Sequence, residues 1–151
     1  MNIVLFSPLA NTSAIGRVTA LIVPELTRLG HRVTIVRTER GGRLSVPPHP
    51  CGAKTVDWND ESAVEAALHD ADGLVYQIGN NSDFHCGGLY WLARRPGIVC
   101  LHDFVLAHLF AEWAESRRSE AEEVLKNWYD GSIARSFVAA KDHREFLDGA
   151  G

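Results

Sequence analysis

The sequence predicts an α/β fold built on a doubly wound parallel sheet, and three observations lead to this prediction. Short apolar runs alternate along the chain with segments whose apolar residues are spaced by three and four. The runs lack polar alternation, which is typical of strands buried on both faces of a parallel sheet. The chain has 151 residues, 46% of them hydrophobic, which suits one domain with its own core.

The first strand is expected at residues 3–6, an apolar run that ends at Ser7 and Pro8. Thr12 or Ser13 can cap the helix that follows. One face of this helix is apolar and is expected to pack on the sheet: Ile15, Val18, Ile22, Leu26 and Leu29. A buried strand therefore leads directly through a short loop into an amphipathic helix.

Gly16 lies in the first turn of this helix, where a missing side chain lets a ligand approach the backbone. The free N–H groups at a helix start attract anions, phosphate above all. An ordinary strand-to-helix connection explains the same residues equally well, so both interpretations stay open.

Four more strands are expected at residues 32–37, 54–58, 73–77 and 98–101. Capping boxes formed by Ser62 with Glu65 and by Ser119 with Glu122 predict two helix starts, and Asn59 is an alternative cap for the first. Further helices are expected at residues 87–95, 104–116 and 132–146. Right-handed crossovers and a central first strand give the strand order 3-2-1-4-5, with extra helices at the C-terminal end.

Ligands of such sheets bind beyond the carboxyl ends of the strands, where the first and fourth strands diverge. The loop before Gly16, residues 79–85 and the pair His102 and Asp103 are expected to converge there. Imidazole and carboxylate groups bind sugar hydroxyls well. The alternative is that His102 caps a helix or binds a carbonyl group.

Asn80, Asn81 and His85 offer hydrogen bonding in both directions, which suits polyhydroxylated ligands, although asparagine also holds tight turns. His85, His102, Asp103 and His108 have no recognised metal-ligand spacing, so no metal is expected.

Several classes of protein are disfavoured. The first loop lacks the G-x-G-x-x-G motif of a nicotinamide dehydrogenase, and Glu39 alone, at a plausible ribose distance, does not restore that site. The G-x-x-x-x-G-K-[ST] motif of a phosphate-transferring P-loop protein is also absent from the sequence. A net charge of −4 argues against nucleic-acid binding. Since no apolar stretch approaches the roughly 20 residues of a membrane span, the chain is expected in the cytoplasm, with peripheral membrane association left open.

The order and spacing of residues 13–17, 26–35, 76–85 and 96–103 resemble the N-terminal half of a retaining glycosyltransferase of the GT-B fold, in particular the family 4 group. The resemblance implies that residues 1–151 are a single Rossmann-like, acceptor-side domain. The acceptor would be a sugar, a lipid-linked molecule or another small molecule. The nucleotide-sugar donor would bind mainly to a second domain absent from this chain, without a metal or other cofactor.

By position in the family, His102 would meet the transferred sugar and Asp103 would support it as the second catalytic residue. Ile15, Gly16 and Arg17 would bind the donor phosphates or the acceptor. Asn80, Asn81 and His85 would line the acceptor side.

The family's groups for the diphosphate, including its E-x7-E carboxylates, belong to the absent half, and Glu115 and Glu123 fall on other helices. The chain alone is therefore expected not to transfer sugar efficiently. The alternatives are a stand-alone Rossmann-like binding or partner module without catalysis, and a flavodoxin-like nucleotide binder.

Overall fold

The computed structural model describes residues 1–115, 117–129, 131–140 and 145. They form two compact units, one spanning Met1–Phe104 and one beginning at Val105. The extra helices predicted at the C-terminal end lie in the second unit. The first unit consists of β1 (Asn2–Ser7), α1 (Ala14–Arg28), β2 (Arg32–Arg37), the 3-10 helix η1 (Gly41–Ser45), β3 (Lys54–Asp57), α2 (Glu61–His69), β4 (Gly73–Ile78), α3 (Ser82–Leu92) and β5 (Ile98–Leu101).

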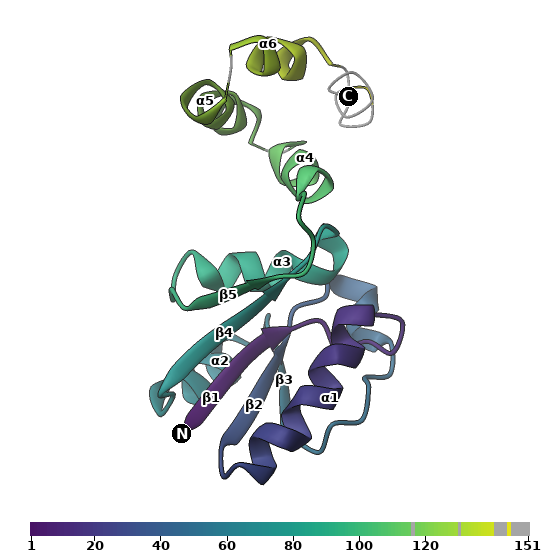
Figure 1. The fold of residues 1–151 in the computed structure, drawn as a ribbon, viewed down its shortest axis with the longest axis vertical. Helices are drawn as coiled ribbons and strands as arrows, with labels where there is room; N and C mark the ends of the chain where they lie inside the picture. Colours follow the sequence, from purple (N-terminus) through teal and green to yellow (C-terminus); the bar gives the residue numbers. More distant parts are fainter. Residues whose placement is uncertain (116, 130, 141–144, 146–151) are drawn as a thin grey trace. The chain divides into compact units, whose positions relative to one another are not determined.

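The five strands form one parallel sheet in the order β3-β2-β1-β4-β5 (Figure 1). This confirms the predicted fold class and strand order. β1 is central, and Leu5 pairs with Ile35 of β2 on one side and with Val75 of β4 on the other. Because the strands are parallel, the loops that follow β1, β4 and β5 lie at the same edge of the sheet.

Helix α1 covers one face of the sheet, and α2 and α3 cover the other (Figure 1). Successive side chains of β1 reach opposite faces, as the pleat requires. Leu5 packs in a cluster with Val23 of α1. The next residue, Phe6, stacks on Tyr76 with ring centroids 4.4 Å apart and approaches Trp91 of α3. The core is therefore divided into two layers by the sheet.

Helix α1 buries a different face from the one predicted. Its buried residues are Gly16, Thr19 and Val23, whereas Val18 and Ile22 of the expected face are exposed. Gly16 and Thr19 contribute nothing to an apolar pattern, so the apolar spacing misplaced the face.

Two close contacts set this rotation of α1. A Cβ atom on Gly16 would lie 3.0 Å from the carbonyl oxygen of Pro8, so a glycine is needed where the helix meets the loop. On the same side, Thr19 Oγ1 lies 2.7 Å from Ser7 Oγ. The first turns of α1 are thus held against the end of β1.

Two helix starts also differ from the prediction. α2 is capped by Asp60, whose carboxylate accepts a hydrogen bond from the N–H of Ala63 at 3.0 Å, and neither Ser62 nor Asn59 is its cap. α5 begins before Ser119 and has no side-chain cap. Aspartate caps as well as serine, and a capping-box pattern does not choose between neighbouring candidates.

The second unit contains α4 (Ala107–Glu115), α5 (Arg118–Trp128) and α6 (Gly131–Ala139). Their core consists mainly of small and aromatic residues: Ala114, Ala121, Leu125, Ala134, Phe137 and Ala140, with Phe110, Trp113 and Ile133 packed against it. The expected continuation of the last helix falls mostly outside the described residues. No helix in the described ranges is long and apolar enough to cross a bilayer.

Strand β5 forms one edge of the sheet and is poorly covered. Its residues Ile98, Val99 and Leu101 are exposed, although the strand carries no charged or hydroxyl-bearing side chain. A sequence typical of a strand buried on both faces thus lies at an edge.

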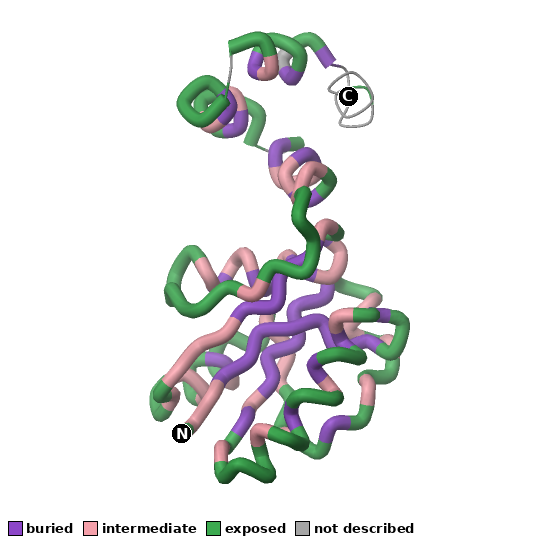
Figure 2. The backbone as a smooth tube through the Cα atoms, in the orientation of Figure 1, coloured by how far each residue is buried: buried purple, intermediate pink, exposed green. Residues whose placement is uncertain are grey.

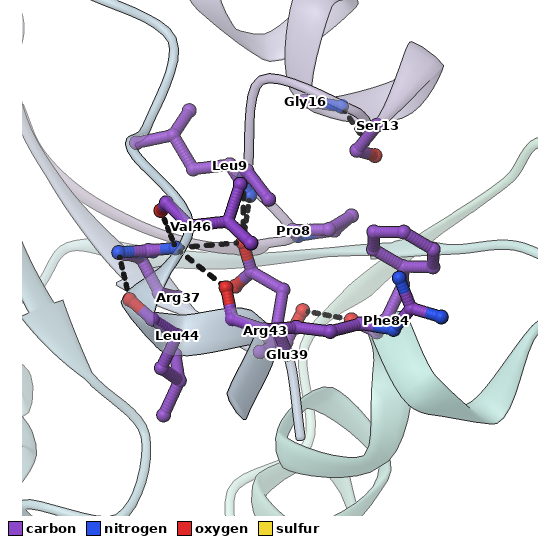
Figure 3. Close-up of polar contacts among 12 residues, drawn as sticks. Pro8, Leu9, Ser13, Gly16, Arg37, Glu39, Arg43, Leu44, Val46 and Phe84 are labelled. Atoms are coloured by element: carbon purple, nitrogen blue, oxygen red, sulfur yellow. Dashed lines mark hydrogen bonds and ion pairs between the residues drawn. The ribbon is translucent and has the colours of Figure 1, made fainter. Parts of the chain in front are cut away.

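A buried ion pair just after β2 holds the loop that follows β1 (Figure 3). Glu39 is fully buried, and its Oε1 accepts hydrogen bonds from the backbone N–H groups of Leu9 at 2.7 Å and Ala10 at 2.6 Å. Nη2 of Arg37 lies 3.2 Å from the same oxygen. The Glu39 side chain is thus buried inside the fold and does not line the pocket at the sheet edge.

The Arg37 guanidinium also ties in η1, because it donates to the carbonyl oxygens of Leu44 at 2.9 Å and Val46 at 3.1 Å (Figure 3). The indole N–H of Trp58 donates to the Glu39 carbonyl oxygen at 2.8 Å. One ion pair therefore joins β2, η1 and the start of the β1–α1 loop.

Replacing Glu39 by glutamine should lower the free energy of unfolding by about 3 kcal/mol, because the buried Arg37 guanidinium then lacks its counter-charge. Urea unfolding followed by circular dichroism measures the change. The control is Glu25→Gln, which breaks an exposed pair with Arg28 and should cost less than about 0.5 kcal/mol. Equal losses in the two variants would contradict a structural role for the buried pair.

Candidate functional site

A pocket of about 510 Å³ opens at the carboxyl edge of the sheet. It lies where β1 and β4 send their following loops in opposite directions, the place where ligands bind in doubly wound sheets. Its lining comes from the loops after β1, β4 and β5 and from the first turns of α1 and α3: Thr12, Ser13, Ala14, Ile15, Val18, Asn80, Asn81, Phe84, His85, His102 and Asp103.

Gly79 lies where three walls of the pocket meet. A Cβ atom added to it would lie 2.7 Å from Cδ1 of Ile15, 2.9 Å from Oδ2 of Asp103 and 2.9 Å from Nε2 of His85. These side chains come from the first turn of α1, the loop after β5 and the first turn of α3. They converge on one point, so a side chain at residue 79 would require all three to move. Sequence reasoning missed this role, and a glycine directly after an apolar strand is the signal that could have revealed it.

His85 is the most deeply buried polar residue of the pocket lining, with 2% of its surface exposed. Burial is the main reason that its pKa falls from 6.5 to about 4. The nearby His102 ring also lowers the pKa, while Asp103 and the Gln77 backbone partly offset the shift. No hydrogen-bond partner for its Nδ1 occurs in the described part of the chain. His85 is therefore neutral at physiological pH.

His102 is exposed, and hydrogen bonds hold both its backbone and its ring. Its backbone N–H donates to the Ile78 carbonyl oxygen at 2.9 Å, and its ring Nε2 bonds to Oε1 of the buried Gln77. Since an amide oxygen only accepts, Nε2 carries the proton and Nδ1 is left for another partner. Gln77 was missed in the sequence, although a polar residue inside an apolar strand run is a visible signal.

Asp103 is tied to the loop after β4. Its Oδ2 accepts a hydrogen bond from the backbone N–H of Asn80 at 2.7 Å. The resemblance implies that Asp103 supports His102, and the His102 ring hydrogen-bonds to Gln77. Asp103 joins the loops after β4 and β5, and both loops line the pocket.

Asn81 is the N-cap of α3, because its Oδ1 accepts a hydrogen bond from the N–H of Asp83 at 3.0 Å. The sequence predicts a polar loop up to His85 and a helix from residue 87, so the observed start at Ser82 corrects that boundary. Asn81 thus holds the local turn, as one interpretation of the sequence expected, and it also lines the pocket.

Of the three residues proposed for the donor phosphates or the acceptor, Ile15 lines the pocket. Gly16 donates its N–H to Ser13 Oγ at 3.0 Å, and the space beside it is filled by the backbone of Pro8 and Leu9. The Arg17 side chain is exposed and is not part of the lining. The glycine therefore serves packing of the chain on itself.

The lining is more apolar than polar, and it is nearly free of charge. Its ionisable residues are Asp103 and the two histidines, and no lysine or arginine contributes to it. Phe84 supplies an aromatic wall, backed by the Arg43 guanidinium 4.5 Å from the ring centroid. Among the described residues no group of three or more His, Cys, Asp and Glu could hold a metal ion. The pocket is suited to an uncharged ligand that carries several hydroxyl groups.

Comparisons of the chain with protein-family models, with curated proteins and with solved structures find no match. The glycosyltransferase family named from the sequence motifs is therefore a proposal that rests on those motifs and on the pocket.

Replacing Gly79 by alanine should lower the free energy of unfolding by about 1 to 3 kcal/mol, because the new methyl group overlaps three side chains at once. Urea unfolding measures the loss. Gly42→Ala is the matched control, since nothing lies within 4 Å of a Cβ atom there. If the Gly79 variant were as stable as this control, the convergence of the three walls would be wrong.

The neutral state of His85 should make the fold less stable in acid. In the unfolded chain histidine titrates near 6.5, whereas the pKa of His85 in the fold is about 4. The stabilisation that depends on a neutral His85 is fully present above pH 6.5. It is lost as the pH falls toward 4, by on the order of 3 kcal/mol in all.

Urea unfolding between pH 7 and pH 4.5 tests this, with His85→Gln as the comparison. The wild-type chain should lose more stability over this range than the variant. Parallel pH profiles of the two proteins, or an NMR titration of His85 with a midpoint near 6.5, would contradict a buried neutral ring.

Proposed function

We propose that this chain is the acceptor-binding part of a retaining glycosyltransferase of the GT-B type. The observation that carries the proposal is the pocket lining, which combines groups that both donate and accept hydrogen bonds with an apolar wall and, among the described residues, includes no lysine or arginine. Such a lining suits the hydroxyl groups and the C–H faces of a sugar ring. It does not suit a nucleotide diphosphate, which cationic side chains commonly bind.

The residues would divide the work by position. Nδ1 of His102, at the exposed mouth, can accept a hydrogen bond from a ligand hydroxyl group. Asp103 accepts strongly through the oxygen that does not bind Asn80, and Phe84 packs against the ring face. His85 and Gly79 shape the inner wall.

The reaction of the proposed family supplies the context for His102. The acceptor hydroxyl oxygen forms a bond to the anomeric carbon of the donor sugar, and the bond from that carbon to the diphosphate oxygen breaks. The hydroxyl proton passes to the leaving diphosphate. The part assigned to this chain is to bind the acceptor and orient its hydroxyl group, while the donor belongs to a further domain.

Binding of simple glycosides to the isotope-labelled chain, followed by NMR, tests the proposal. Methyl glucoside, methyl galactoside and methyl mannoside form the panel. At least one should shift the backbone signals of Asn80 and His102 in a saturable way. His102→Ala should weaken that binding at least tenfold, or by about 1.4 kcal/mol.

The matched control is His69→Ala, which removes an exposed histidine on α2 outside the pocket and should leave glycoside binding unchanged. Shifts produced by free UDP, GDP or ADP but by no glycoside would favour a nucleotide binder instead. Glycoside binding that is indifferent to His102→Ala would remove His102 from the proposed role.

A further inference from the structure

An exposed apolar stripe runs along the outer side of α1. It consists of Val18, Leu21 and Ile22, whose exposed fractions are 40%, 67% and 39%. Residues three and four apart on a helix are surface neighbours, so these side chains form one continuous patch. Figure 2 shows the same alternation along α1, with exposed segments between the buried turns that face the sheet. Single exposed apolar residues are common, but a contiguous group of them is less so.

The stripe is continuous with the pocket. Val18 belongs to both, and Ile15, one turn earlier on the same side, also lines the pocket. From there the stripe leads along the helix away from the carboxyl edge of the sheet. A ligand group seated in the pocket would therefore have an apolar path beside it.

The size of the stripe limits what can cover it. Three side chains are far fewer than the 20 to 30 residues that each partner contributes to a stable protein interface. They are enough to contact one alkyl chain. No lysine or arginine of the described residues lines the pocket, which further favours a ligand whose polar group is uncharged.

We propose that the natural ligand is amphiphilic, with an uncharged hydroxyl-bearing head in the pocket and an apolar chain lying along Val18, Leu21 and Ile22. This inference rests on the proposed function and specifies its substrate class. The hydrophobic gain comes from covering side chains that the fold leaves in water.

Calorimetric titrations of the full chain with methyl and octyl glycosides of glucose, galactose and mannose, below the micelle concentration of the octyl compounds, test the inference. For the sugar that binds, the octyl glycoside should bind at least tenfold more tightly than the methyl glycoside. The double variant Leu21→Gln, Ile22→Gln should abolish this difference and leave the methyl affinity unchanged. Glutamine keeps a good helix propensity at both exposed positions.

Leu29→Gln is the matched control. Leu29 is 63% exposed and lies two helical turns beyond Ile22, about 10 Å along the axis, so the octyl advantage should persist in this variant.

Each outcome decides between the two proposals. Methyl glycosides could bind and lose affinity in His102→Ala while the octyl chain adds no affinity. That result would overturn the inference of an amphiphilic ligand and leave the proposed function standing. If the octyl glycoside still bound more tightly than the methyl glycoside in the double variant, its alkyl chain would lie elsewhere and the inference would be overturned. If neither series binds, the proposed function fails and the amphiphile fails with it.

Discussion

The contact on which the rest of the pocket depends is the carboxylate of Glu39 bound to two consecutive backbone N–H groups. Leu9 and Ala10 lie between β1 and α1, so holding them fixes where α1 begins. The helix then approaches closely enough for Gly16 to touch the backbone of Pro8. Glu39, which follows β2 and pairs with Arg37, thus positions the α1 wall of the pocket without lining the pocket itself. Removing one partner of such a buried pair is costly, because the other charge is then left uncompensated.

The sheet was predictable because each strand carries its signal locally. An apolar run bounded by glycine, proline or polar residues identifies a buried strand whatever its neighbours are, and handedness rules then restrict the strand order. The buried face of α1 was not predictable in the same way, since Gly16 and Thr19 face the sheet through a close approach and a hydroxyl contact. The start of α3 was missed for a related reason. Asn81 can either hold a turn or cap a helix, and the sequence pattern allows both.

The same distinction applies to the site. His102 and Asp103 were predicted from their place at the end of the fifth strand, and Asn80, Asn81 and His85 from the loop after the fourth. Ile15 was named from the family resemblance. All six line the pocket. Gln77 and Gly79 were missed because their roles depend on residues distant in sequence. Gln77 binds His102, which follows β5, and Gly79 has three side chains close to where its Cβ atom would be. Arg17 was included with Ile15 and Gly16 from the family resemblance, but the helical rotation that buries the glycine leaves the Arg17 side chain outside the lining.

The exposed edge strand β5 has a consequence for the behaviour of this protein in solution. Among the described residues no strand pairs with its outer edge, and no lysine or proline interrupts the run Ile98–Leu101. Natural proteins commonly protect such edges, because an unprotected one is a template for strand addition between molecules. The brevity of β5 limits how many hydrogen bonds an added strand could gain. Self-association through this edge would therefore be weak, reversible and dependent on protein concentration.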